Sequence, residues 1–241
     1  MSRPAPFLAA VRAQAAVEAR LTARRGENLL AMVAVPAAVL VFFSWVGRDA
    51  ASLLPAALAL AIVASGLVNL GIATAYERGY GVLKRLGGSP LGRSGLLAAK
   101  LLVVGAIGLI QVIPLIAVAA TLGWRSNAMI DPLALALTTI LGVAAFAGLG
   151  LLLAGTLRPE ATLVVANVLF LAVVLVGGTL VPIDALPAPL QSIVGLLPFG
   201  ALGTAFRAAL GDGGALLPSM VVLAAWAAGA VVVTARTFEW E

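Results

Sequence analysis

The stretch Tyr76–Lys100, YERGYGVLKRLGGSPLGRSGLLAAK, is a polar island between two long apolar runs. It carries five cations, a single acid and several glycines, whereas nearly everything around it is long and apolar enough to cross a bilayer. A chain that only has to turn round between two membrane spans does not need so elaborate a loop. We therefore interpret this stretch as the surface through which another protein drives this one.

The composition outside the island indicates that the bilayer is the solvent for this chain. Of the 241 residues, 62% are hydrophobic and 10% are charged, whereas soluble domains are about 45–50% apolar and about 25% charged. We expect residues 1–241 to form one all-α integral membrane domain. The formal net charge of +5 could suggest nucleic acid, but the cations lie at span ends, which is a topology signal, so no nucleic-acid partner is predicted. The absence of Cys and His excludes disulfides and argues against a metal site.

Six stretches without a charged residue each contain eighteen or more residues, which is enough to cross a hydrocarbon core of about 30 Å. The predicted transmembrane helices are residues 29–46, 53–75, 101–122, 132–157, 161–181 and 215–235. Placing the N-terminus in the cytoplasm puts twelve cations inside and three outside, which is a clear positive-inside bias. Both termini are therefore predicted to be cytoplasmic.

Two further segments are predicted to be helical without crossing the membrane. Residues 6–25 place apolar residues near one helical face and charged residues, mostly basic, on the rest, and are expected to form an amphipathic helix lying at the membrane interface. Residues 186–210 are uncharged up to Arg207 but are interrupted by prolines and glycines that a lone lipid-facing helix tolerates poorly. We interpret them as a re-entrant pair of short helices before the sixth span. The alternative is a seventh span, which would place the C-terminus outside.

Within the island, residues 79–88 are predicted to form a short coupling helix on the cytoplasmic side between spans two and three. Tyr80–Leu86 can form one or two turns, with Val82, Leu83 and Leu86 on one side and Lys84 and Arg85 on the other. Gly87-Gly88 ends this helix, and Ser89-Pro90 is typical of the start of the next one.

At these residues the chain resembles the membrane subunits of ABC exporters of the ABC-2 type, including the daunorubicin-exporter-like permeases. The matching island residues are Glu77, Arg78, Gly79, Leu83, Lys84, Arg85, Leu86, Ser89 and Pro90. A second resemblance lies in the outer pair, at Pro182, Leu186, Pro187, Leu190, Pro198, Phe199 and Arg207. The family commonly has a second acid where this chain has Tyr76.

The resemblance implies a permease subunit that exports a hydrophobic drug, antibiotic or lipid across a bacterial cytoplasmic membrane, as in multidrug efflux and antibiotic resistance. It implies a separate ABC ATPase, in two copies, which carries the ATP and Mg, and a second permease chain as homo- or heterodimer. The ATPase-coupling residues would be Glu77, Arg78, Gly79, Tyr80, Leu83, Lys84, Arg85 and Leu86. No phosphate loop of the form GxxxxGK[ST] occurs, and the glycines of Phe146–Gly150 are interpreted as helix-packing positions, so no ATPase site is predicted in this chain.

Three polar side chains lie inside the predicted spans. We interpret Asn69 and Asn167 as contacts to substrate in the transport pathway, and Gln111 as an interhelical hydrogen bond. The alternatives to an exporter are an ion-coupled secondary transporter, which normally needs ionisable groups within its spans, and a membrane assembly factor without transport activity. An intramembrane enzyme would need a nucleophile with a base or a metal cluster, which this composition makes hard to assemble.

Overall fold

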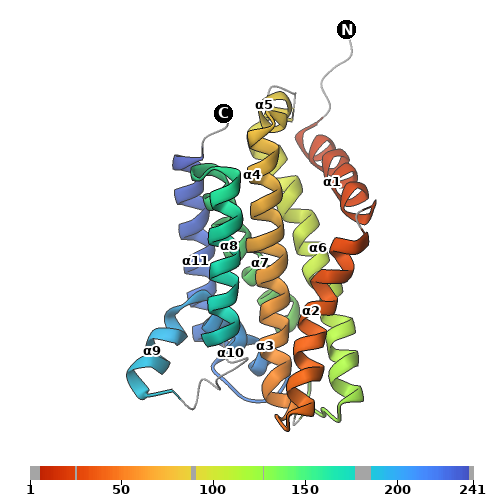
Figure 1. The fold of residues 1–241 in the computed structure, drawn as a ribbon, viewed down its shortest axis with the longest axis vertical. Coiled ribbons are helices and arrows are strands. Elements are labelled where there is room, and N and C mark those ends of the chain that lie inside the picture. The colour runs from red at the N-terminus through yellow and green to blue at the C-terminus, as the bar shows by residue number, and fades with distance from the viewer. Residues whose placement is uncertain (1–5, 25, 88–90, 127, 177–185, 239–241) are drawn as a thin grey trace.

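The structure is a computed structural model that describes residues 6–24, 26–87, 91–126, 128–176 and 186–238; the side chains of Asn28, Leu29, Leu86, Arg93 and Val176 lie outside the described set. The described part is a bundle of helices without a strand (Figure 1). Its elements are α1 (Phe7–Arg24), α2 (Gly26–Trp45), α3 (Ala50–Val63), the π-helix η1 (Ala64–Leu70), α4 (Gly71–Gly79), α5 (Val82–Gly87), α6 (Gly92–Thr121), α7 (Pro132–Thr156), α8 (Pro159–Val176), α9 (Ala188–Leu196), α10 (Pro198–Ala209) and α11 (Leu216–Thr237).

The predicted fold class, an all-α integral membrane protein, is confirmed. Four helical columns in the described residues are long and apolar enough to cross a membrane: Ala50–Gly79, Ser94–Thr121, Pro132–Thr156 and Leu216–Thr237. Leu30–Trp45 and Pro159–Leu175 are apolar but shorter. These six columns correspond to the six predicted spans, although residues 177–181 of the fifth span lie outside the described residues.

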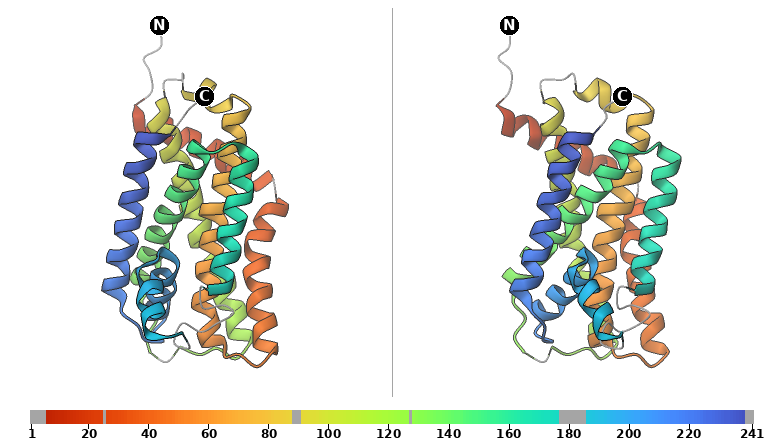
Figure 2. Two further views of the ribbon diagram at one scale, coloured as in Figure 1. Left: turned by 60° about the vertical axis from the view of Figure 1, so that its left-hand side comes forward. Right: turned by 90° about the vertical axis from the view of Figure 1, so that its left-hand side faces the viewer.

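The two ends of the bundle have different architectures. Helices α1 and α5 and the C-terminal end of α11 lie at one end, and α9 and α10 lie toward the other (Figures 1 and 2). The pair α9 and α10 is bent by 90° at Leu197, beside Pro198, a geometry that fits either a broken span or a re-entrant loop. The α6–α7 connection is tied to this pair, because Asp131 N donates to Ala209 O at 2.9 Å and Trp124 Nε1 donates to Asp212 Oδ2 at 3.1 Å.

The column formed by α3, η1 and α4 is the centre of the bundle, and small residues let α7 approach it closely. A Cβ added at Gly150 would lie 2.6 Å from Gly66 O, and one added at Gly71 would lie 3.0 Å from Gly150 O. On another face of α7, a Cβ at Gly148 would lie 2.7 Å from Ala230 Cβ of α11. The interpretation of the Phe146–Gly150 glycines as helix-packing positions is therefore confirmed.

Candidate coupling site

The coupling segment is the stretch from Glu77 to Gly87, which includes the end of α4, a turn and α5. Gly81 takes a φ of +71°, a conformation that side-chain-bearing residues rarely adopt, and so permits the turn between α4 and α5. The Tyr80 side chain is 75% exposed and Val82 is 38% exposed, and the Lys84 and Arg85 side chains are also exposed. These four residues form the outward surface of the segment, with an aromatic ring beside two cations.

Leu83 points the other way, into its own chain. It is 1% exposed and belongs to a small apolar cluster, here called the coupling cluster, with Val11 of α1, Leu91 next to α6, and Leu96 and Ala99 of α6. Phe238, just after α11, packs against the same cluster. Leu83 therefore anchors α5 to three other parts of the permease, and the Leu86 side chain lies outside the described residues.

Arg78 and Gly79 connect α4 to the turn between α7 and α8. The Arg78 side chain is buried, with Nη1 donating to Gly155 O at 2.8 Å and Nη2 donating to Leu157 O. Gly155 lies in the last turn of α7 and Leu157 directly follows that helix. Carbonyls at the C-terminal end of a helix lack helical N–H partners and carry partial negative charge. A Cβ added at Gly79 would lie 2.9 Å from Pro159 Cγ, so the absence of a side chain there permits the close approach of α8.

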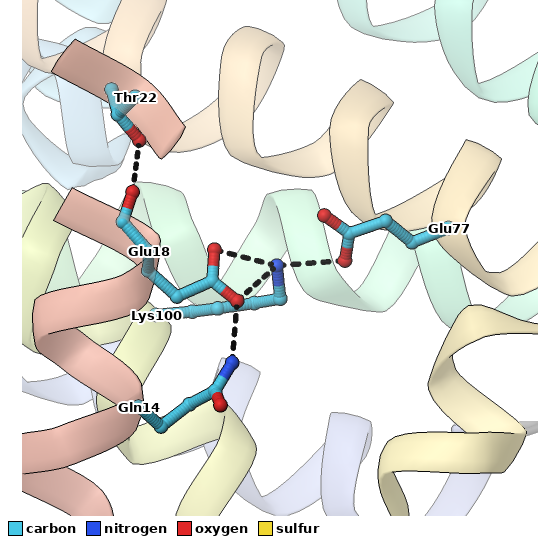
Figure 3. A network of polar contacts seen from close by, with 5 residues as sticks. All are labelled: Gln14, Glu18, Thr22, Glu77 and Lys100. Carbon is cyan, nitrogen blue, oxygen red and sulfur yellow. Dashed lines mark hydrogen bonds and ion pairs between the residues drawn. The ribbon is translucent and has the colours of Figure 1, made fainter. Parts of the chain in front are cut away.

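Glu77 pairs with a lysine rather than with the cations of its own segment. The Lys100 ammonium lies between two carboxylates, 2.7 Å from Glu77 Oε2 and 3.4 Å from Glu18 Oε1 (Figure 3). Gln14 Nε2 donates to Glu18 Oε1 at 3.1 Å, which orients this carboxylate. We call Glu18, Glu77 and Lys100 the ionic triad; it joins α1, α4 and α6.

Asn69 and the ionic triad line the same cavity. A cavity of about 100 Å³ is lined by all three triad residues together with Ser65 and Asn69 of the π-helix. Single π-helical turns often mark functional sites because the extra residue per turn redirects side chains. Ser65 Oγ donates to Ala61 O at 3.0 Å, whereas among the described residues the structure gives the Asn69 amide no hydrogen-bond partner.

The other two candidate polar residues lie elsewhere. Asn167 is exposed on α8, where its Nδ2 donates only to Leu163 O of the same helix at 2.8 Å, and the structure does not bring it together with Asn69. Gln111 is 2% exposed, and its Nε2 donates to Met32 O of α2 at 3.4 Å, which confirms the interhelical interpretation.

The structure also brings into contact with Glu77 or its lysine partner two residues that were not among the sequence candidates, Glu18 and Lys100. In the sequence both looked like ordinary charges at the membrane surface, because a pattern of one helix does not show which charge of another helix faces it. The only available signal was that Lys100 directly precedes an apolar span and that Glu18 is the only acid of the amphipathic helix.

Comparison with known protein families identifies the chain. The sequence model described as ABC-2 type transporter matches residues 11–210, from within α1 to just after α10. A search of curated proteins gave no significant match. Members of this family generally work with a separate ABC ATPase. The chain therefore belongs to the ABC-2 type transporter family, as the multi-pass permease component of an ABC transporter without an ATPase site of its own.

Proposed function

We propose that this chain is the permease of a bacterial exporter that moves a hydrophobic small molecule, a drug, antibiotic or lipid, out across the cytoplasmic membrane. Two ABC ATPase subunits supply the energy, and a second permease chain, identical or different, completes the pathway. Both termini and the coupling segment face the cytoplasm, in accord with the positive-inside bias of the sequence.

The observation that carries this proposal is the two-sided construction of α5. Its outward side offers Tyr80, Val82, Lys84 and Arg85 to a partner, and its inward side inserts Leu83 into the coupling cluster. Because buried side chains are close-packed, a push on α5 moves α1 and α6 together with it. The Arg78 hydrogen bonds extend the connection to the end of α7.

The pathway in this proposal involves both Asn69 and Asn167. Asn69 opens into the cavity beside the ionic triad, and Asn167 presents an amide on the exposed, otherwise apolar outer face of α8. A lipid-facing amide is unfavourable, so the second permease chain is expected to cover Asn167.

Charge reversal tests the coupling role without disturbing the coupling cluster. The Lys84→Glu/Arg85→Glu variant, co-expressed with an ABC ATPase that co-purifies with the unaltered permease, should still fold but should lose most ATP-driven export from whole cells. Its control, Arg48→Glu/Arg125→Glu, makes the same change in net charge at the opposite end of the bundle and should export normally. Unchanged co-purification with the ATPase and unchanged export by the Lys84/Arg85 variant would contradict the proposal.

A further inference from the structure

Two neighbouring hollows are lined in part by α1. The first is the polar cavity of about 100 Å³ that contains the ionic triad. The second is an apolar groove of about 540 Å³ between α1, α2 and α6, whose walls include Ala15, Ala19, Ala106 and Ile110. Thr22, Val103 and Ile107 line both hollows, so a polar and an apolar hollow lie directly next to each other.

The polar part has an excess of negative charge. Lys100 supplies one positive charge to two carboxylates, and its side chain is only 3% exposed. The Glu18 and Glu77 side chains are 16% and 30% exposed and both line the cavity, although Glu77 Oε2, the oxygen next to Lys100, is itself buried. A carboxylate accepts several hydrogen bonds, and an uncompensated charge at a partly buried site is costly. A ligand with one positive charge would neutralise the triad.

The apolar part includes an amide whose oxygen has no hydrogen-bond partner among the described residues. Gln111 lines the groove, is 2% exposed, and its Oε1 is buried without a hydrogen-bond partner among the described residues. Gln111 follows Lys100 on the same helix, about 16 Å further along the axis at 1.5 Å per residue. The site is therefore long enough for an extended hydrocarbon chain and offers an acceptor for a polar group at its far end.

We propose that these two adjacent hollows together bind an amphiphile with a single cationic head, the head beside Glu18 and Glu77 and the hydrocarbon chain in the groove under α1. An anionic head would have to take Lys100 away from Glu77, 2.7 Å distant, and would leave both carboxylates without a cation. A neutral head would leave the excess charge in place. The inference rests on the proposed function only in taking the bound amphiphile as the exported cargo.

Photolabelling of the permease without any ATPase tests binding separately from transport. The full-length chain, in nanodiscs of phosphatidylcholine, is exposed to dodecylammonium that carries a photoactivatable diazirine in its chain, and the labelled residues are mapped by mass spectrometry. Labels should fall on the groove walls of α1, α2 and α6. Unlabelled dodecylammonium should displace the probe at about tenfold lower concentration than dodecanol or dodecyl sulfate, as expected for one charge-assisted contact.

Matched variants assign the charge preference to the triad. Glu77→Gln keeps the shape of the side chain and should remove the preference over dodecanol, whereas Glu160→Gln, an exposed acid at the start of α8, should keep it. Equal displacement by dodecanol or dodecyl sulfate in the unaltered chain, or labels outside the groove, would overturn the proposal. Because no ATPase is present, failure here leaves the coupling role of α5 untouched, and failure of the charge-reversal test leaves this site untouched.

Discussion

The glycine seam between η1 and α7 and the ionic triad under α1 join helices in opposite ways. At the seam, backbone meets backbone: a Cβ at Gly150 would lie 2.6 Å from Gly66 O and 2.9 Å from Leu67 O. At the triad, long charged side chains bridge α1, α4 and α6 across a cavity. Backbone contact at the seam therefore allows one distance between η1 and α7. The long side chains of the triad allow several distances between α1, α4 and α6.

This difference suggests how a push on the coupling segment is distributed. Close-packed interfaces transmit motion as rigid bodies, and we expect the central column, α7 and α11 to move as one unit. The helices around the triad can instead change their distance while Lys100 keeps one of its two partners. The cavity beside Asn69 therefore lies at the boundary between a rigid and an adjustable part of the permease.

Filling the seam should have the largest effect. Gly150→Leu places a side chain where backbone atoms of η1 already lie, and the neighbouring backbone cannot rotate away as a side chain could. We expect a loss of about 3 kcal/mol or more in the free energy of unfolding, at the upper end for overpacked cores. Thermal unfolding of the purified permease in detergent, with size-exclusion chromatography, measures this.

The control for the seam is Gly105→Leu on α6, because a Cβ at Gly105 has no neighbour within 4 Å. This variant should unfold at nearly the same temperature as the unaltered chain. Equal destabilisation by the two substitutions would show that the seam is no more tightly packed than the surface of α6.

Removing the anchor of α5 should have an intermediate effect. Leu83→Ala empties a buried position, and such truncations cost about 2–5 kcal/mol in protein cores. The coupling cluster is small and lies at the end of the bundle, so we expect about 2 kcal/mol at most, with α5 released while the seam stays folded. Hydrogen exchange should rise in α5 and the start of α6 but not in α7, and Val82→Ala on the exposed side serves as the control. A rise in α7 as large as that in α5 would contradict the difference between the two regions.

The sequence predicts the helices better than their contacts. Uncharged runs and the Asp131-Pro132 start, where Asp131 Oδ1 accepts from Ala134 N at 3.0 Å, are local signals, so the fold class and the helix beginning at Pro132 follow from them. The small residues of Phe146–Gly150 likewise indicate close packing, although the partner helix cannot be read from them.

The coupling site shows where local patterns stop being informative. The sequence predicts Arg78 and Leu83 as ATPase-coupling residues, which stays a prediction; the structure adds that Arg78 donates to a carbonyl at the end of α7 and that Leu83 packs in the coupling cluster. Assigning residues to helix faces from the sequence assumes regular α-helical turns. The π-helix η1 interrupts these turns between Ala64 and Leu70, so Asn69 lies on a different face from the one that a regular α-helix would give it. Such tertiary contacts depend on which helices meet, and this information is spread over the whole chain.

The ionic triad should give the smallest effect on stability and the most local one. Lys100→Met keeps most of the apolar length of the side chain but leaves Glu18 and Glu77 facing each other without a cation. Both acidic side chains are partly exposed, although Glu77 Oε2 itself is buried, so we expect a loss of about 1 kcal/mol, below the 3–5 kcal/mol of a fully buried pair. Adding Glu18→Gln to Lys100→Met should recover part of that loss, because the repulsion between the two acids then disappears, and Lys84→Met is the control for removing an exposed lysine. Hydrogen exchange should increase in α1 alone; an equal increase in α7 would mean that the triad holds the central column and is no adjustable contact at all.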